Sequence, residues 1–175
     1  MDWRIASYRP IDGEFSPHGL EELLRAQGAH LCYPRCHDGE LQFSLEEGCR
    51  WQRSSFGILE PQGDAIALDS IDLLLLPAVA VDTRGYRLGF GGGYYDRLLE
   101  RAPMLRFRSC ALCFLEQRCA ALPNEHHDAR LAACLDANGL HLFEQAANVS
   151  SAASFPSTTL GAELPQAQSQ EPEVP

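Results

Sequence analysis

The most apolar stretch of the chain constrains its fold most strongly. It reads "IDLLLLPAVAV" from Ile71 to Val81, and after Asp72 it contains no polar residue. A strand without polar alternation is typical of the centre of a parallel sheet, where helices cover both faces. No apolar run approaches the ~20 residues needed to cross a bilayer. The run therefore predicts an α/β domain built on a mainly parallel sheet.

The segments before this run carry alternating strand and helix signals. Trp3–Tyr8 and His30–Pro34 are predicted as strands, and Ser16 and Gly28 suit the start and the stop of a helix between them. Asp38–Gly39 is a hairpin signal, after which "ELQFSL" returns as a third strand. A strand, a helix and a strand in this order predict a βαβ crossover.

The segments after the run continue the pattern. "YYDRLLERA" from Tyr94 is predicted as a helix, "RSCALCF" from Arg108 as a strand, and "LHLF" from Leu140 as a short last strand. Residues 53–68 are predicted to form a long connection, and residues 116–135 a short helix with a loop.

The C-terminal composition marks a domain boundary. From Ala146 onward the chain consists mainly of Ala, Ser, Thr, Pro, Gln and Glu, with no basic residue. Such a segment buries too little apolar surface to fold. We therefore expect one domain over residues 1–145 and a disordered acidic tail over 146–175.

Charge and composition exclude several functions. The net charge of −10 argues against a nucleic-acid binder. All fourteen basic residues are arginine, which excludes a P-loop of the Gly-Lys-Ser/Thr type and Schiff-base chemistry on lysine. The start of the chain lacks the plan of a signal peptide, so we expect a cytoplasmic protein without membrane contact.

The seven cysteines are scattered, which is typical of reduced thiols. Cys110 and Cys113 form a C-x-x-C pattern, but on a strand positions i and i+3 point to opposite faces. Cys32, Cys36 and His37 resemble half a zinc site, although no second pair has matching spacing. A cysteine-based metal module stays open as an alternative.

The stretch "RLGFGGGYYDR", from Arg87 to Arg97, predicts a ligand site. Glycines allow a close approach of the backbone to a ligand, and a helix N-terminus offers unpaired N–H groups and positive partial charge. These features favour a phosphate, and Asp96 in the first turn favours Mg²⁺ beside it. The alternative is a plain tight turn in which Asp96 only complements the helix dipole, and in which Arg97 is a solvated helix residue.

The sequence segments around this loop resemble those of a known protein family. "LLLLPAVAVDTRGYRLGFGGGYYDRLL" resembles the signature of the 5-formyltetrahydrofolate cyclo-ligase (methenyltetrahydrofolate synthetase) family. "ASYRPIDGEFSPHGLEELLRAQG", "FGILEP" and "LEQRCAALPNEHHDARL" resemble further family segments, in the family's order over roughly residues 3 to 143. The resemblance implies a three-layer open, mainly parallel sheet with helices on both faces.

The resemblance also implies a reaction. The family uses ATP and Mg²⁺ to convert 5-formyltetrahydrofolate to 5,10-methenyltetrahydrofolate, with release of ADP and phosphate. The formyl oxygen attacks the γ-phosphate, and the folate N10 then closes the ring as phosphate leaves. Such a transfer needs positioning and an electrostatic clamp more than a protein nucleophile. We expect 5-formyltetrahydrofolate and ATP as the partners of a monomeric ligase.

The resemblance assigns roles to individual residues. Arg87 and Tyr94 would be catalytic, Asp96 and Asp128 would bind Mg²⁺, and Glu14 would hydrogen-bond the pterin ring. The residues that would hold ATP are Arg87, Leu88, Gly89, Phe90, Gly91, Gly92, Gly93, Tyr94 and Tyr95. The residues that would contact the folate are Arg9, Glu14, Phe56, Phe90, Gly91, Gly92, Gly93 and Tyr94.

The resemblance departs from the family at both ends. The family normally begins with about fifty more residues that include a basic motif for ATP, so the chain is expected to be N-terminally truncated. Near the C-terminus, "LAACLDANG" differs from the family pattern at Ala132, Asp136 and Ala137. An alternative function is therefore a non-catalytic module that binds folate or nucleotide.

Overall fold

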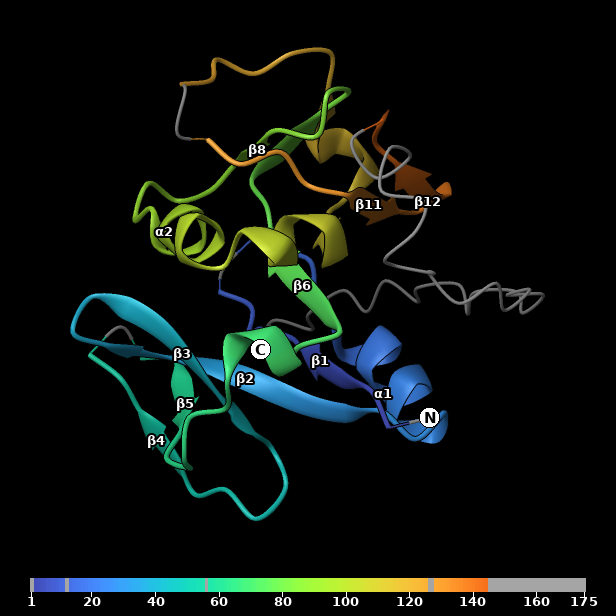
Figure 1. The fold of residues 1–175 in the computed structure, drawn as a ribbon. Helices are drawn as coiled ribbons and strands as arrows, with labels where there is room; N and C mark the ends of the chain where they lie inside the picture. The colour runs from blue at the N-terminus through green and yellow to red at the C-terminus, as the bar shows by residue number, and fades with distance from the viewer. Residues whose placement is uncertain (1, 12, 56, 126–127, 145–175) are drawn as a thin grey trace, which may run out of the picture.

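The central feature of the fold is a seven-stranded sheet with the order β12-β11-β9-β6-β1-β2-β3 (Figure 1). The computed structural model describes residues 2–11, 13–55, 57–125 and 128–144. The inner strands run parallel, and the edge strands β3 and β12 run antiparallel to their neighbours. The strands are β1 (Arg4–Ala6), β2 (His30–His37), β3 (Glu40–Leu45), β6 (Leu73–Pro77), β9 (Ser109–Leu112), β11 (Ala133–Asp136) and β12 (Gly139–Leu142).

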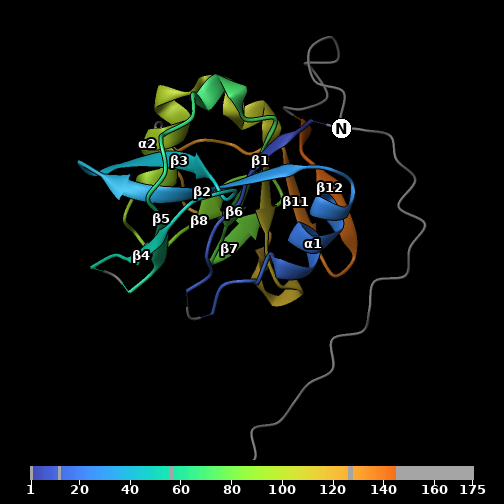
Figure 2. The same cartoon turned by 90° about the horizontal axis from the view of Figure 1, so that it is seen from below.

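Two helices, α1 (His18–Ala26) and α2 (Tyr94–Arg101), lie on opposite faces of this sheet (Figure 2). β6 sends alternate side chains to the two faces. Leu74 and Leu76 pack in the cluster that contains Leu98 of α2, whereas Leu75 packs in the cluster that Leu24 of α1 borders. All three strand leucines are fully buried, or nearly so. The predicted three-layer α/β fold is confirmed.

The local signals for the helix stop and the hairpin turn are also confirmed, whereas the N-cap of α1 is Pro17 rather than Ser16. Ser16 precedes it, and its Oγ accepts a hydrogen bond from His18 N at 3.5 Å. Gly28 follows α1 with a φ of 82°, and the turn between β2 and β3 is Asp38–Gly39 with φ values of 51° and 78°. Positive φ at both central residues is the geometry that favours Asp-Gly in a two-residue hairpin.

The apolar run forms two strands rather than one. β6 ends at Pro77, and β7 (Ala80–Asp82) belongs to a separate sheet with β8 (Arg87–Leu88) and β10 (Arg118–Cys119). Val79 N donates to Leu88 O at 2.8 Å, which fixes the new direction. The glycine loop therefore follows β8 and not the central strand β6.

Two stretches for which no strand was expected contain strands. Within residues 53–68 lies β5 (Leu59–Pro61), which pairs antiparallel with β4 (Trp51–Arg53) just before it, and within 116–135 lie β10 and most of β11. β4 and β5 are short and contain polar residues, and β10 and β11 pair with strands that are distant in the sequence. Apolar periodicity in the sequence therefore does not reveal these strands. The described ranges also contain the 3₁₀ helices η1 (Leu68–Ser70), η2 (Pro103–Arg108) and η3 (Leu115–Gln117).

Cys110 and Cys113 lie in clusters on opposite faces of the sheet, as predicted. The Sγ of Cys113 instead lies 3.3 Å from that of Cys134 on the neighbouring strand. No helix within the described ranges is long and apolar enough to span a membrane. The predicted tail, residues 146–175, lies outside the described residues.

Candidate active site

Two loops meet where the strand order of the sheet reverses. β1 and β6 are parallel neighbours, but the chain leads from β1 to β2 on one side and from β6 to β9 on the other. The loop after β1 carries Arg9 and Glu14, and the segment after β6 carries Arg87–Asp96. Open α/β sheets bind ligands outside the carboxyl ends of their strands at such a switch point.

The glycine loop leaves its backbone amides free. Gly91 and Gly93 have φ values of 87° and 63°, a conformation that side chains disfavour. Gly93 immediately precedes α2, whose first-turn N–H groups have no partner within the helix. Within the described part of the chain, the amides of Gly91, Gly92 and Gly93 donate no hydrogen bond. The loop can therefore bind an anion through its backbone, beside the exposed side chain of Phe90.

Arg87 and Asp96 bracket this loop as an ion pair. Arg87 Nη2 lies 3.3 Å from both carboxylate oxygens of Asp96. The Arg87 side chain is only 5% exposed and that of Asp96 30% exposed. The guanidinium also lies 5.3 Å from the ring centre of Tyr95, and the buried Arg87 Nε has no hydrogen-bond partner among the described residues. The pair thus holds a nearly buried cation next to the loop.

Glu14 reaches the same place from the other loop. Its Oε2 accepts a hydrogen bond from Ile11 N at 2.9 Å. Burial raises the pKa of Glu14, against the opposing effects of the Ile11 N–H group and the charge of Arg87. Burial raises the pKa of Tyr95 as well, and the Glu14 charge adds to that shift while Arg87 opposes it. Three residues predicted from distant segments therefore interact electrostatically in one site.

Arg9 occupies a different wall of the site. Its guanidinium carbon lies 4.1 Å from the ring centre of Tyr33 and 4.7 Å from that of Trp51, and its Nη2 lies 3.5 Å from Glu46 Oε1. It borders a partly apolar cavity of about 380 Å³ between the loop after β1 and the β4–β5 hairpin. The cavity is lined by Arg9, Pro10, Ile11, Arg53, Gly57, Ile58 and Leu59.

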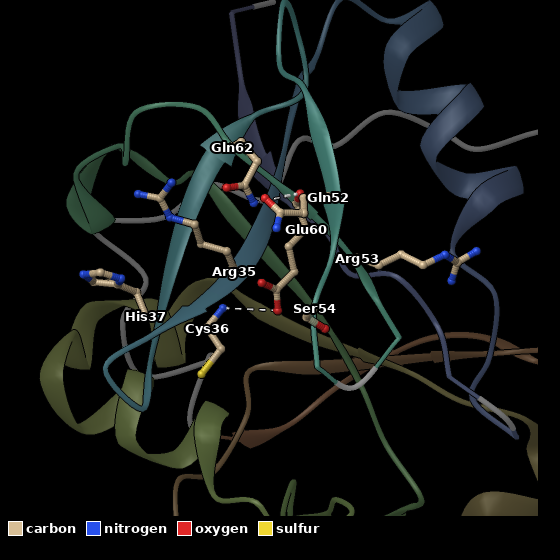
Figure 3. A pocket seen from close by; sticks show the side chains of 8 residues that line it. All are labelled: Arg35, Cys36, His37, Gln52, Arg53, Ser54, Glu60 and Gln62. Carbon is tan, nitrogen blue, oxygen red and sulfur yellow. Dashed lines mark hydrogen bonds between the residues drawn. The ribbon is translucent and has the colours of Figure 1, made fainter.

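A second, more polar cavity of about 330 Å³ lies between β2 and the same hairpin (Figure 3). Its lining residues are Arg35, Cys36, His37, Gln52, Arg53, Ser54, Glu60 and Gln62. Tyr94 adjoins it, because the neighbouring Cys36 thiol is the main cause of a raised pKa of Tyr94. Tyr94 therefore keeps its phenol proton at neutral pH.

The remaining predicted residues divide between described and undescribed parts of the chain. Asp128 Oδ2 accepts a hydrogen bond from Glu125 N at 2.7 Å. Phe56 lies outside the described residues. Among the residues described, no three His, Cys, Asp or Glu side chains gather as a protein-only metal site would require.

Asp82 was not among the residues predicted from the sequence, but its side chain links two loops of the site. Its buried carboxylate accepts hydrogen bonds from the N–H groups of Arg84 (2.8 Å), Tyr86 (3.0 Å) and Leu122 (3.1 Å). The β7–β8 turn that leads to Arg87 is thereby tied to the loop that leads to Asp128. An Asp that accepts hydrogen bonds from the N–H groups of its own turn can be recognised in a sequence. Its hydrogen bond with Leu122 cannot, because it depends on the tertiary fold.

We expect Asp82→Asn to lower the free energy of unfolding by about 2 kcal/mol or more, because an amide NH₂ would face buried N–H donors. Burial alone would raise the pKa of Asp82, but hydrogen bonds from Leu122, Arg84 and Tyr86 hold it below its usual 3.8. A depressed pKa stabilises the fold above pH 3.8, and this contribution is lost as the pH falls through the folded value.

Urea unfolding of Asp82→Asn as a function of pH tests this, with the exposed Asp64→Asn as the matched control. The difference from the unmodified chain should shrink at acid pH. A pH-independent difference, or none, would show that the ionised carboxylate does not fasten the turn.

Comparison with known proteins places these features in one family. The sequence model of the 5-formyltetrahydrofolate cyclo-ligase family matches residues 1–136. The 5-formyltetrahydrofolate cyclo-ligase of Haemophilus influenzae is 34% identical over 134 residues, covering 73% of this chain and 72% of the relative. The enzyme of that name from Saccharomyces cerevisiae is 29% identical over 167 residues, covering 81% and 79%.

Solved structures agree with this relationship. The NMR structure of 5,10-methenyltetrahydrofolate synthetase from Aquifex aeolicus superposes with a TM-score of 0.66 at 28% identity, covering 81% of this chain and 72% of that one. The synthetase from Mycoplasma pneumoniae gives 0.58 at 25% identity, covering 75% and 71%. The fold, the glycine loop and the sequence match together show that the chain belongs to the 5-formyltetrahydrofolate cyclo-ligase family.

Proposed function

We propose that the chain converts 5-formyltetrahydrofolate to 5,10-methenyltetrahydrofolate, using ATP and Mg²⁺ and releasing ADP and phosphate. One observation carries the proposal beyond family membership. A glycine loop with free amides lies at the switch point of the sheet, within electrostatic reach of Glu14 on the other loop. One loop suits a phosphate chain and the other a polar heterocycle.

The phosphate chain of ATP binds along Arg87–Tyr95 in this proposal. The amides of Gly91, Gly92 and Gly93 donate to phosphate oxygens, and the positive end of α2 adds favourable potential. Arg87 stabilises the charge of the transferring phosphoryl group. It is suited to this because it is nearly buried, where charges interact strongly, and because no described residue accepts a hydrogen bond from its Nε.

The residues present fit a magnesium ion. Mg²⁺ is commonly held by one or two carboxylates together with substrate phosphates and water, so no cluster of three protein ligands is needed. Asp96 would hold it beside the phosphate loop, and Asp128 would be the second carboxylate. The ion supplies charge neutralisation for the phosphates when bound. Arg87 leaves part of the Asp96 carboxylate available, because that group has about four acceptor sites.

The folate binds on the other side of the loop. Glu14 accepts hydrogen bonds from the pterin ring, and Arg9, Phe56 and Phe90–Tyr94 border the rest of the molecule. The partly apolar cavity beside Arg9 and Ile58 is large enough for an aromatic ring and lies next to Ile11, which donates to Glu14. In this arrangement the formyl group faces the glycine loop.

The reaction then needs little covalent chemistry from the protein. The formyl oxygen attacks the γ-phosphorus, and the bond from that phosphorus to ADP breaks. N10 attacks the activated formyl carbon and closes the ring, the N10 proton passes to solvent, and phosphate leaves with the former formyl oxygen. Tyr94, a phenol at neutral pH, orients the formyl group by donating a hydrogen bond. Positioning and charge stabilisation carry the rate enhancement.

Absorbance of the methenyl product tests the proposal. The full chain is mixed with 5-formyltetrahydrofolate and Mg²⁺, with and without ATP. An ATP-dependent rise is expected. Ligand binding by calorimetry without any absorbance rise would instead favour the non-catalytic binding module.

A further inference from the structure

Arg97 has an exposed side chain, but its guanidinium is held by two backbone carbonyls. Its Nη1 donates to Gly92 O at 3.0 Å, and its Nη2 donates to Gly39 O of the β2–β3 hairpin at 3.1 Å. The guanidinium carbon lies 4.9 Å from the ring centre of Tyr94. Long side chains in a helix run back toward its N-terminus, and this one passes the start of α2 to reach Gly92. Its charge therefore lies at the anion-binding end of the helix.

The positive charge of Arg97, unlike that of Arg87, is not balanced by a carboxylate of the described residues. Arg87 is paired with Asp96 at 3.3 Å. No carboxylate in the described ranges lies within ion-pair distance of Arg97, and its side chain is exposed. A guanidinium has five N–H donors, of which the two carbonyls use two. Three donors and a full positive charge stay available beside the glycine amides.

We propose that Arg97 is a further phosphate-binding residue of this site. Its bonds to Gly92 and Gly39 hold the guanidinium against the loop, and its free donors contact the phosphate chain of the nucleotide. This inference rests on the proposed function, because it requires that a nucleoside triphosphate binds at the loop. It adds a residue that the sequence pattern left on the solvated face.

Arg101 offers a matched control on the same helix. It too ties α2 to the β2–β3 hairpin, donating to Leu41 O at 2.7 Å and pairing with Glu40. Among the described residues, none of its hydrogen bonds or ion pairs involves the glycine loop, and its charge is matched by Glu40. A purely structural role for Arg97 predicts that the two arginines behave alike, whereas phosphate binding predicts that only Arg97 affects nucleotide affinity.

The experiment measures the Kd of the Mg²⁺ complex of the non-hydrolysable analogue adenosine 5′-(β,γ-imido)triphosphate by calorimetry on the full chain. Arg97→Gln should raise Kd about tenfold or more, the effect of losing a charge-assisted contact. Arg97→Lys should retain part of the affinity because it keeps the charge, and Arg101→Gln should bind as the unmodified chain does. Thermal melts check that each variant is folded.

The outcomes separate this inference from the proposed function. An unmodified chain that binds no analogue contradicts both. Tight binding by the unmodified chain and equally tight binding by Arg97→Gln overturns the role of Arg97 alone. An equal loss in Arg97→Gln, Arg97→Lys and Arg101→Gln would also overturn it, because it would indicate loosening of α2 rather than a lost phosphate contact.

Discussion

Asp96→Asn is expected to lower the turnover of 5-formyltetrahydrofolate with Mg·ATP by about 10²- to 10³-fold, a typical loss for one group that stabilises transition-state charge. Asp96 lies in the first turn of α2, beside the glycine loop, and keeps 30% of its side chain exposed. It is the carboxylate best placed to share a cation with phosphate oxygens. Steady-state assays over a range of Mg²⁺ concentrations measure the loss.

Asparagine is chosen so that a loss of activity does not arise from a loss of stability. Removing the side chain altogether would leave the nearly buried Arg87 without its partner, and an unpaired buried charge is strongly destabilising. Asparagine retains an oxygen that accepts from Arg87. Glu100→Gln, at an exposed position of the same helix, is the control. If Asp96→Asn has the activity of the unmodified chain at ordinary Mg²⁺ concentrations, Asp96 does not bind the metal ion.

The elements that the sequence predicted correctly are those with local causes. The turn at Asp38–Gly39 follows from residues that tolerate positive φ, and the helix from Tyr94 follows the glycines that precede it. The central strand was recognised because Leu73–Leu76 has no polar position, which both covered faces require. Each of these signals lies within a few residues of the element it specifies.

The elements that were missed have tertiary causes. The apolar run continues past Pro77, and hydrophobicity is the same whether that segment extends one sheet or begins another. The bond from Val79 N to Leu88 O decides between them. β11 contains Ala133 and Cys134, which have little strand preference, and is a strand because β9 and β12 flank it.

In the candidate site, too, some residues have local sequence signals, whereas the interactions between them depend on the fold. The glycine loop and Asp96 could be proposed from their spacing, and Glu14 from resemblance. That Glu14 and Arg87 interact depends on β1 lying beside β6, a consequence of sheet order that no local pattern contains. The hydrogen bonds of Arg97 could not be predicted from the sequence, because its two carbonyl partners, Gly92 and Gly39, are brought together only in the folded chain.

Glu14→Gln is expected to raise the KM for 5-formyltetrahydrofolate about 10- to 100-fold, the range for losing charge-assisted hydrogen bonds to a bound ligand. The Kd for the Mg²⁺ complex of the ATP analogue should change little. Glu14 is the carboxylate of the loop after β1, and the proposal assigns it to the N–H donors of the pterin ring. Glu22→Gln, on exposed α1 surface, controls for the loss of one charge.

The same variant should gain stability while it loses affinity. Burial raises the folded pKa of Glu14 above its ordinary 4.5, so the folded chain binds its proton more tightly than the unfolded chain does. Ionised Glu14 therefore destabilises the fold above the folded pKa, and this cost disappears below pH 4.5, where both states are protonated. Glu14→Gln should melt at a higher temperature at neutral pH and at an equal temperature in acid.

The folate KM of the unmodified chain supplies the complementary measurement. As the pH falls through the folded pKa of Glu14, protonation removes the carboxylate acceptor, and the KM should rise toward that of Glu14→Gln, whose own KM should vary less. A variant that is stabilised but binds folate normally would confirm the buried charge and reject the pterin contact. Weaker folate binding together with a lower melting temperature would instead mean that Glu14 holds the loop in place through Ile11.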